Sequence, residues 1–124
     1  MIIVTSFGYL HGAPPRAHLV VDVRRSLHNP AADPVMRELT GRDERVRRHV
    51  LTTPRAGQLL DNLLDATRSA LPAVQGQDLR VAIGCAGGRH RSVVLADELA
   101  RLLTGDGLSV EVAHRDVDRP VVRR

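Results

Sequence analysis

A chain of 124 residues has the length of one domain, and it can bury enough surface to fold without a disulfide or a structural metal. A single cysteine excludes an internal disulfide, and one phenylalanine and one tyrosine are too few aromatic rings for a base-stacking platform. All 18 positive side chains are arginines, and the net charge of +4 favours an anionic partner.

The first part of the chain predicts two strands joined by a loop. Residues 2–6 and 19–23 are short apolar runs, which are typical of buried strands. Glycines and prolines between them, over residues 7–16, predict a loop. The connection that follows is long and irregular, and a short helix is expected to begin in it at Asp33 or Pro34, with Asp33 as its cap.

The rest of the chain alternates between helices and strands. We expect helices at 45–51, 55–71 and 92–103, and strands at 79–83 and 108–112. Apolar residues of the 55–71 segment recur on one helical face, and Pro72 ends that helix. This alternation predicts one α/β domain with a mostly parallel sheet of about four strands, flanked by helices. We place the domain at residues 1–115 and a basic, flexible tail at 116–124.

Residues 84–92 are the most informative segment of the chain, because they lie between a predicted strand and a predicted helix. Glycines allow close backbone approach to a ligand, and the first N–H groups of a helix attract anions. Two arginines and a histidine add further donors. We therefore predict a phosphate site made of Cys85, Ala86, Gly87, Gly88, Arg89, His90, Arg91 and Ser92.

Polar residues near the ends of the other strands are expected to support this site. In parallel sheets, ligands bind beyond the carboxyl ends of the strands. The supporting residues that we predict in this crevice are Ser6, Asp22, Arg24, Asn29 and His114. Asp22 and Arg24 are two residues apart on a strand and point the same way, so they either pair with each other or hold Arg91 in place.

The same loop also permits an enzyme. Cys85, Gly88, Arg91 and Ser92 have the spacing found in cysteine-dependent phosphatases, and a helix N-terminus with flanking arginines stabilises a thiolate. Such an enzyme needs a general acid, and no spacing chooses among Asp22, Asp33 and Asp43. The other interpretation of Cys85 is a small, inert, buried side chain.

Other chemistries find no support in the sequence. No pair of the six histidines has helical ligand spacing, and one cysteine makes no zinc signature, so no metal is expected. The Walker nucleotide-binding pattern is absent, and no other cofactor is expected. No apolar run approaches the roughly 18 residues of a membrane span, so we expect a cytoplasmic protein without membrane contact.

Short motifs along the chain carry a family resemblance. Their order is Ser6-Phe7-Gly8-Tyr9, Gly12-x-Pro14, Asp22-Val23-Arg24, Asn29-Pro30, Asp33-Pro34, Thr40-Gly41-x-Asp43, the run 82–92, and His114-Arg115. Together they resemble the C-terminal domain of the RapZ family of RNase adapter proteins. Full-length members also carry a kinase-like domain with a Walker P-loop, which this sequence lacks, so we expect a stand-alone C-terminal-type domain.

The resemblance implies a fold like a phosphofructokinase subdomain and a non-catalytic sensor or adapter function. It implies that an amino-sugar phosphate, glucosamine-6-phosphate, binds the loop, that a small RNA or a protein is a partner, and that the domain forms a homo-oligomer. It also implies the family's nucleotide-binding description. The sequence departs from the family at Ala86, usually a threonine, and at Ala31, where the family has a histidine. A phosphatase and an RNA-binding module without a small ligand remain the alternatives.

Overall fold

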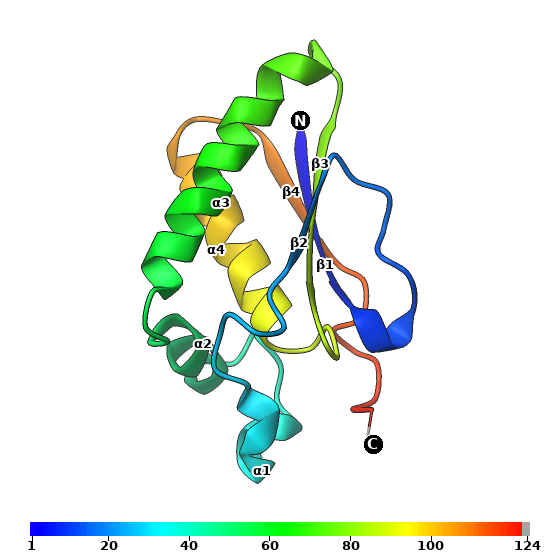
Figure 1. Ribbon diagram of the computed structural model, residues 1–124, viewed down its shortest axis with the longest axis vertical. Helices are drawn as coiled ribbons and strands as arrows, with labels where there is room; N and C mark the ends of the chain where they lie inside the picture. The colour runs from blue at the N-terminus through cyan, green and yellow to red at the C-terminus, as the bar shows by residue number, and fades with distance from the viewer. Residues whose placement is uncertain (123–124) are drawn as a thin grey trace.

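The computed structural model describes residues 1–122, which fold around a four-stranded sheet (Figure 1). The strands are β1 (Ile2–Gly8), β2 (Leu19–Asp22), β3 (Leu79–Cys85) and β4 (Val110–His114). Their order across the sheet is β2-β3-β1-β4, and all three pairings are parallel. This confirms the prediction of an α/β domain with a four-stranded sheet and shows that the sheet is parallel throughout.

The helices are α1 (Pro34–Arg37), α2 (Glu44–Leu51), α3 (Ala56–Ala70) and α4 (Arg91–Gly105). Single 3-10 turns lie at Tyr9–His11, Pro30–Ala32 and Leu71–Val74. The helix α4 packs against β1, β3 and β4, while α2 and α3 pack against its other side (Figure 1). As a result, α4 is buried nearly all round, although its sequence predicted only an amphipathic helix.

The core lies between α4 and one face of the sheet. Its fully buried members include Val4 on β1, Val81 on β3 and Leu99 on α4. Val4 and Val81 are register partners, so their side chains leave the sheet on the same side. Burying these apolar side chains is the main stabilisation of the domain, at roughly 1.5–3 kcal/mol for each large one.

Three strand boundaries differ from the sequence prediction for identifiable reasons, namely the ends of β1 and β3 and the start of β4. The central strands β1 and β3 run on to Gly8 and Cys85, because these two residues are still register partners in the ladder. The last strand starts at Val110, two residues later than predicted. Its expected first residue, Leu108, instead donates its amide to the carbonyl of Leu103 and closes the C-terminus of α4.

The first residues of the segment that follows β4 are buried in the domain. Asp116 is fully buried and Val117 is 2% exposed, so ordered packing extends past the boundary that we placed at residue 115. Of residues 118–122, Val121 is partly buried and the others are exposed, whereas residues 123–124 of the expected tail lie outside the described residues. Within residues 1–122, no helix is long and apolar enough to cross a membrane.

Candidate anion-binding site

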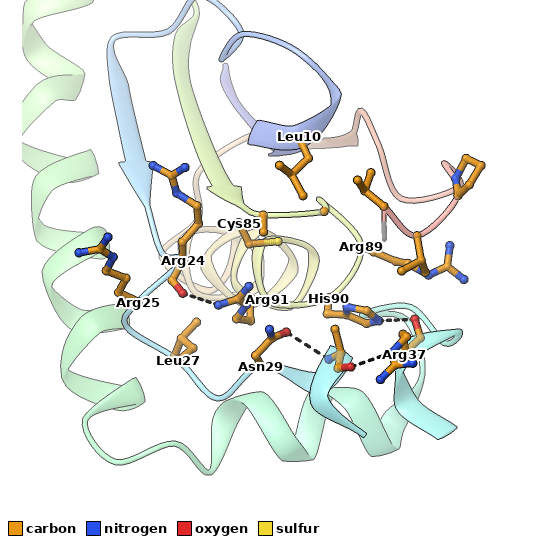
Figure 2. Close-up of a pocket in the computed structure, with 16 residues that line it drawn as sticks. Leu10, Arg24, Arg25, Leu27, Asn29, Arg37, Cys85, Arg89, His90 and Arg91 are labelled. Carbon is orange, nitrogen blue, oxygen red and sulfur yellow. Dashed lines mark hydrogen bonds between the residues drawn. The ribbon is translucent and has the colours of Figure 1, made fainter. Parts of the chain in front are cut away.

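A cavity of about 780 Å³ lies at the carboxyl end of β3 and the start of α4 (Figure 2). Its lining is Leu10, Arg24, Arg25, Leu27, Asn29, Ala31, Arg37, Cys85, Ala86, Gly87, Arg89, His90, Arg91, Pro120, Val121 and Val122. Five of these residues are arginines and, within the described part of the chain, none is acidic. The cavity is therefore electropositive and has the size of a small-molecule site.

The glycine loop that forms one wall is held tightly against the end of β1. Gly88 has φ +70°, and a Cβ there would lie 2.5 Å from the amide nitrogen of Gly8. A Cβ on Gly8 would in turn lie 2.3 Å from the carbonyl carbon of Gly87. Both positions therefore require glycine, which lets β1 and the loop touch backbone to backbone.

The loop is also fixed by hydrogen bonds on both sides. The amide of Leu10 donates to the carbonyl of Ala86 at 3.0 Å, and the amide of Gly41 donates to the carbonyl of Arg89 at 2.8 Å. These bonds tie the loop to two segments that are far from it in sequence. The site is therefore rigid on its loop side before any ligand arrives.

Arg91 is the first residue of α4 and is only 5% exposed, yet its guanidinium lines the cavity. One terminal nitrogen donates to the carbonyl of Arg24 at 2.5 Å, and Nε has no hydrogen-bond partner. No acidic side chain among residues 1–122 forms an ion pair with it. Because a buried cation without a counter-charge is costly, this arrangement favours an anionic ligand.

Cys85 and Ser92 lie side by side at the same end of the cavity. The Sγ of Cys85 is 3.2 Å from the Oγ of Ser92, and both residues are buried. Cys85 lines the cavity and Ser92 does not. Of the predicted site residues, Cys85 and Arg91 thus line one cavity, and Ser92 contacts Cys85.

Arg89 lines the cavity but its guanidinium is used within the protein. It donates to the carbonyls of Val117, Arg119 and Glu38, and so joins the segment after β4 to the end of α1. Figure 2 shows its side chain directed away from Arg91. Arg89 therefore holds the site together, and ligand contact by its guanidinium would require these bonds to change.

His90 is a neutral part of the wall. Its Nε2 donates to the carbonyl of Arg37 at 3.1 Å, because a carbonyl can only accept. Burial is the largest influence on this ring and lowers the pKa of His90 below its ordinary value. The imidazole is therefore uncharged at neutral pH.

The sequence left open whether Asp22 and Arg24 pair with each other or hold Arg91 in place. In the structure their side chains pair, and the backbone of Arg24 binds Arg91. The carboxylate of Asp22 accepts from Nε and a terminal nitrogen of Arg24 at 2.6–3.1 Å, and this hydrogen bonding lowers the pKa of Asp22. The guanidinium of Arg24 also lies over the Tyr9 ring, 3.9 Å from its centroid. Arg91 is held by the backbone carbonyl of Arg24 and not by a side chain.

The other three supporting residues divide between the cavity and a separate site. Asn29 lines the cavity, and its side-chain oxygen accepts the amide of Ala31 at 3.1 Å. Ser6 and His114 do not line it. Ser6 is fully buried with its Oγ 2.6 Å from His114 Nδ1, and His114 Nε2 is 2.9 Å from Asp97. Ser6, His114 and Asp97 form a chain of polar contacts between β1, β4 and α4.

The candidate general acids have structural roles, and one important acid was not predicted. Asp33 caps α1, as expected, and Asp43 caps α2. Sequence analysis missed Asp116, whose Oδ2 accepts the amide of Gly8 at 2.8 Å and the Nε of Arg115 at 3.0 Å. Burial acts to raise the pKa of Asp116, but these hydrogen bonds outweigh it and hold the pKa below its ordinary value.

Arg37 was also missed, although it lines the cavity from α1. Its Nε donates to the carbonyl of Ala31 at 2.8 Å. The only signal in the sequence was a basic residue on the short helix predicted to start at Asp33 or Pro34. That helix contributes to the site because its backbone bonds to His90.

Comparison with known proteins identifies the family of this chain. Residues 1–118 match the family described as the RapZ C-terminal domain. A nucleotide-binding protein of Thermobifida fusca is 42% identical over 119 residues, which are 94% of this chain and 40% of that protein. A nucleotide-binding protein of Geobacter sulfurreducens is 42% identical over 117 residues, 92% of this chain and 41% of the relative.

A third relative, a nucleotide-binding protein of Rhodospirillum centenum, is 46% identical over 121 residues, 95% of this chain and 36% of its own length. The chain thus spans about two fifths of the length of these curated relatives. The family match, in contrast, covers nearly all of the chain and includes the glycine loop, Arg91 and Asp116. The chain belongs to the RapZ C-terminal domain family.

Proposed function

We propose that this domain binds a phosphorylated small molecule and acts as a sensor or adapter without turning the ligand over. The phosphate would lie on the loop of residues 85–92 at the start of α4. The observation that carries this proposal is Arg91, a buried guanidinium on the cavity wall that has no acidic partner in the described chain. A phosphate dianion would supply both the missing charge and an acceptor for Nε.

Three further features support a phosphate in particular. The helix α4 is 15 residues long, and its N-terminus favours negative charge. Gly87 lines the cavity, and nothing lies within 4 Å of where its Cβ would be, so a ligand can approach the loop backbone there. The cavity of about 780 Å³ has room for an organic group attached to the phosphate.

The names of the relatives indicate a broad class of ligand. They are named nucleotide-binding proteins, and this name refers to chains more than twice as long as the present one. The family resemblance implies glucosamine-6-phosphate. We therefore include inorganic phosphate, a sugar phosphate and a nucleoside monophosphate as probes of the same site.

Calorimetric titration of the 124-residue chain with these probes tests the proposal. We expect saturable binding, and we expect Arg91→Ala to weaken it by about 10- to 100-fold, the loss of a charge-assisted hydrogen bond worth ~1.5–3 kcal/mol. The matched control is Arg48→Ala, because Arg48 is 73% exposed and outside the cavity. Unchanged affinity in a folded Arg91→Ala protein would contradict the proposal.

One observation favours a second candidate function, a cysteine-dependent phosphatase. The Oγ of Ser92 lies 3.2 Å from the Sγ of Cys85, so a serine hydroxyl could donate to a thiolate nucleophile there. Arg91, six residues after Cys85, would then bind the transferring phosphoryl group. This reaction also needs a positioned acid, and the cavity lining within residues 1–122 contains no carboxyl group.

A further inference from the structure

Residues 117–122, which follow β4, form one side of the cavity, and we call them the C-terminal wall. Pro120, Val121 and Val122 line the cavity from this wall. We infer that the C-terminal wall contacts the organic part of a bound ligand, and that Arg89 is the positioning residue that holds the wall in place. This assignment rests on the proposed phosphate site and adds the residues that meet the ligand beyond its phosphate.

The C-terminal wall is fixed at its first residue and loosely held after it. Val117 is 2% exposed and follows the buried Asp116, whereas the side chain of Asp118 is 84% exposed. The amide of Arg119 donates to the carbonyl of Asp116 at 3.1 Å, which forms a turn. Within residues 1–122, the residues after this turn form no hydrogen bond with the rest of the domain. Their position therefore depends on the contacts that hold residues 117–119.

Arg89 supplies the contacts that tie the C-terminal wall to the cavity. One terminal nitrogen of its guanidinium donates to the carbonyls of Val117 at 3.4 Å and Arg119 at 3.2 Å. The other terminal nitrogen donates to the carbonyl of Glu38, directly after α1. In Figure 2 the side chain of Arg89 extends away from Arg91, on the side where the segment after β4 passes. One guanidinium thus joins the C-terminal wall to the α1 side of the cavity.

The remaining links to the C-terminal wall are weaker or local. Asp118 pairs with Arg42 at 3.5 Å, but both side chains are more than half exposed, and exposed ion pairs contribute little. Arg119 pairs with Asp116, three residues earlier in the same segment. That pair shapes the turn and does not connect it to the glycine loop. Arg89 is therefore the main attachment of the wall to the anion site.

Arginine is the residue type that this attachment requires. Its planar guanidinium carries five N–H donors in a fixed fork, so it can bond to three carbonyls from two segments at once. Lysine has the same charge on a single ammonium group and cannot reproduce the fork. The backbone of Arg89 is itself fixed, because its carbonyl accepts the amide of Gly41 at 2.8 Å. The bonds to the wall therefore start from a rigid point on the glycine loop.

The composition of the C-terminal wall indicates which part of a ligand it meets. Its lining residues are apolar, and Val122 is 40% exposed, whereas all the charged side chains of the cavity lining are arginines. A ligand that extends from the anion site to the wall would bury apolar surface and exclude water from Arg91, and both effects favour binding. Such a ligand also stabilises the wall position in which the contact is made, so affinity and wall position are coupled.

The test compares a phosphate that carries an organic group with one that carries none. Calorimetry would measure glucosamine 6-phosphate and inorganic phosphate on the 124-residue chain and on Arg89→Lys. This variant keeps the charge and loses the fork, so we expect glucosamine 6-phosphate to bind about five-fold or more weakly, and inorganic phosphate to change by less than about two-fold. If Arg89 acted only through its charge, lysine would preserve both affinities.

A second variant changes the C-terminal wall and leaves Arg89 in place. The double substitution Val121→Ser and Val122→Ser removes apolar contacts without changing length or charge. It should weaken glucosamine 6-phosphate and leave inorganic phosphate unchanged. The matched control is Val35→Ser, because Val35 is 63% exposed and does not line the cavity. Thermal melts confirm that each variant is folded, and the double variant keeps the test informative if Arg89→Lys is unstable.

Methyl NMR of valine-labelled protein measures the position of the C-terminal wall directly. Adding glucosamine 6-phosphate should shift the methyl signals of Val121 and Val122 in the parent protein. Before any ligand is added, Arg89→Lys should move the same signals toward random-coil positions, because the attachment of the wall is lost. The methyl signals of Val35 should change in neither case.

The outcomes separate the role of the C-terminal wall from the phosphate site. If both probes bind and neither variant changes the ratio of their affinities, or if the wall methyl signals do not respond to the sugar phosphate, the wall does not contact the ligand and the phosphate site stands. If Arg89→Lys weakens both probes equally, Arg89 acts on the anion and does not position the wall. If neither probe binds the parent protein, the proposed function fails, and the role of the wall fails with it.

Discussion

The amide of Gly8 donates to Oδ2 of Asp116 at 2.8 Å, which joins two residues 108 positions apart in the sequence. The same carboxylate pairs with Arg115 and Arg119. A Cβ on Gly88 would lie 2.9 Å from the Cβ of Asp116, so the glycine loop packs directly on this contact. The end of β1, the loop and the segment after β4 therefore meet at one buried carboxylate.

Replacing Asp116 with asparagine should destabilise the domain by about 1.5–3 kcal/mol at pH 7, because a buried charge-assisted hydrogen bond is lost while the shape is kept. The folded pKa of Asp116 lies below its ordinary value, so its contribution is present above about pH 4 and is lost as the pH falls through the folded pKa. Urea unfolding of both proteins between pH 3 and pH 7 measures this.

The control for this prediction is Asp118→Asn. Asp118 is 84% exposed and forms only a surface ion pair with Arg42, so it should contribute little. Equal unfolding free energies for the Asp116 and Asp118 variants at pH 7 would contradict the role given to Asp116.

Alanine at position 88 should be far more damaging than alanine at position 87. Gly88 has φ +70° and backbone atoms 2.5 Å and 2.8 Å from an added Cβ, whereas nothing lies within 4 Å of a Cβ on Gly87. We expect Gly88→Ala to lower stability by more than about 2 kcal/mol and to weaken phosphate binding, because strain and a backbone clash combine. Gly87→Ala should stay within roughly 1 kcal/mol of the parent. Chemical denaturation of the two variants measures their free energies of unfolding. If Gly87→Ala were the less stable variant, the loop would not be held against β1 as the structure has it.

His90 should make the stability of the domain pH-dependent in the mildly acidic range. Its folded pKa is lowered by burial, while the unfolded chain titrates near the ordinary value of about 6.5. The unfolded state therefore binds the proton better, so stability is highest above pH 6.5 and decreases as the pH falls toward the folded pKa. His90→Gln keeps a donor for the Arg37 carbonyl and should flatten this part of the profile. Parallel profiles for the two proteins would mean that His90 does not cause the dependence.

We expect no hydrolysis of p-nitrophenyl phosphate above background at pH 6–7, because no carboxyl group lines the cavity in the described chain. Cys85→Ser separates the two candidate functions, since it should abolish turnover by a phosphatase and leave phosphate affinity nearly unchanged in either case. Turnover that disappears in Cys85→Ser and is inhibited by vanadate would favour the phosphatase over the non-catalytic sensor or adapter.

Local signals were sufficient for the fold and for the strand, loop and helix that form the candidate site. The apolar run before Gly84, the glycines at 87 and 88 and the helix after them predicted β3, the loop and α4, because each is determined by neighbouring residues. Leucines at helical spacing before Pro72 predicted α3 in the same way. Arg91 was predicted at the site because a helix start fixes where its first residues lie.

The remaining roles depended on contacts between distant segments, which spacing does not encode. Arg89 has the same local setting as Arg91, but carbonyls from positions 38, 117 and 119 engage it. His114 is at the end of the last strand, as predicted, yet β4 lies at the sheet edge beside β1, and His114 does not line the cavity. The acidic residue after Arg115 looked like part of a basic tail, and only the packing of Gly8 reveals its burial.

The strand order has a consequence for how the domain can assemble. The two N-terminal strands, β1 and β2, are not neighbours in the sheet, and each pairs with β3. The ladder between Ile2 and Leu79 closes a loop of more than 70 residues, so the contact order is high and folding is expected to be slower than in a helical bundle of this size. No part of the sheet can form until β3 has been synthesised. During translation, therefore, the apolar strands β1 and β2 stay unpaired until β3 is synthesised. The glycine loop directly follows β3, so it is made at the same stage.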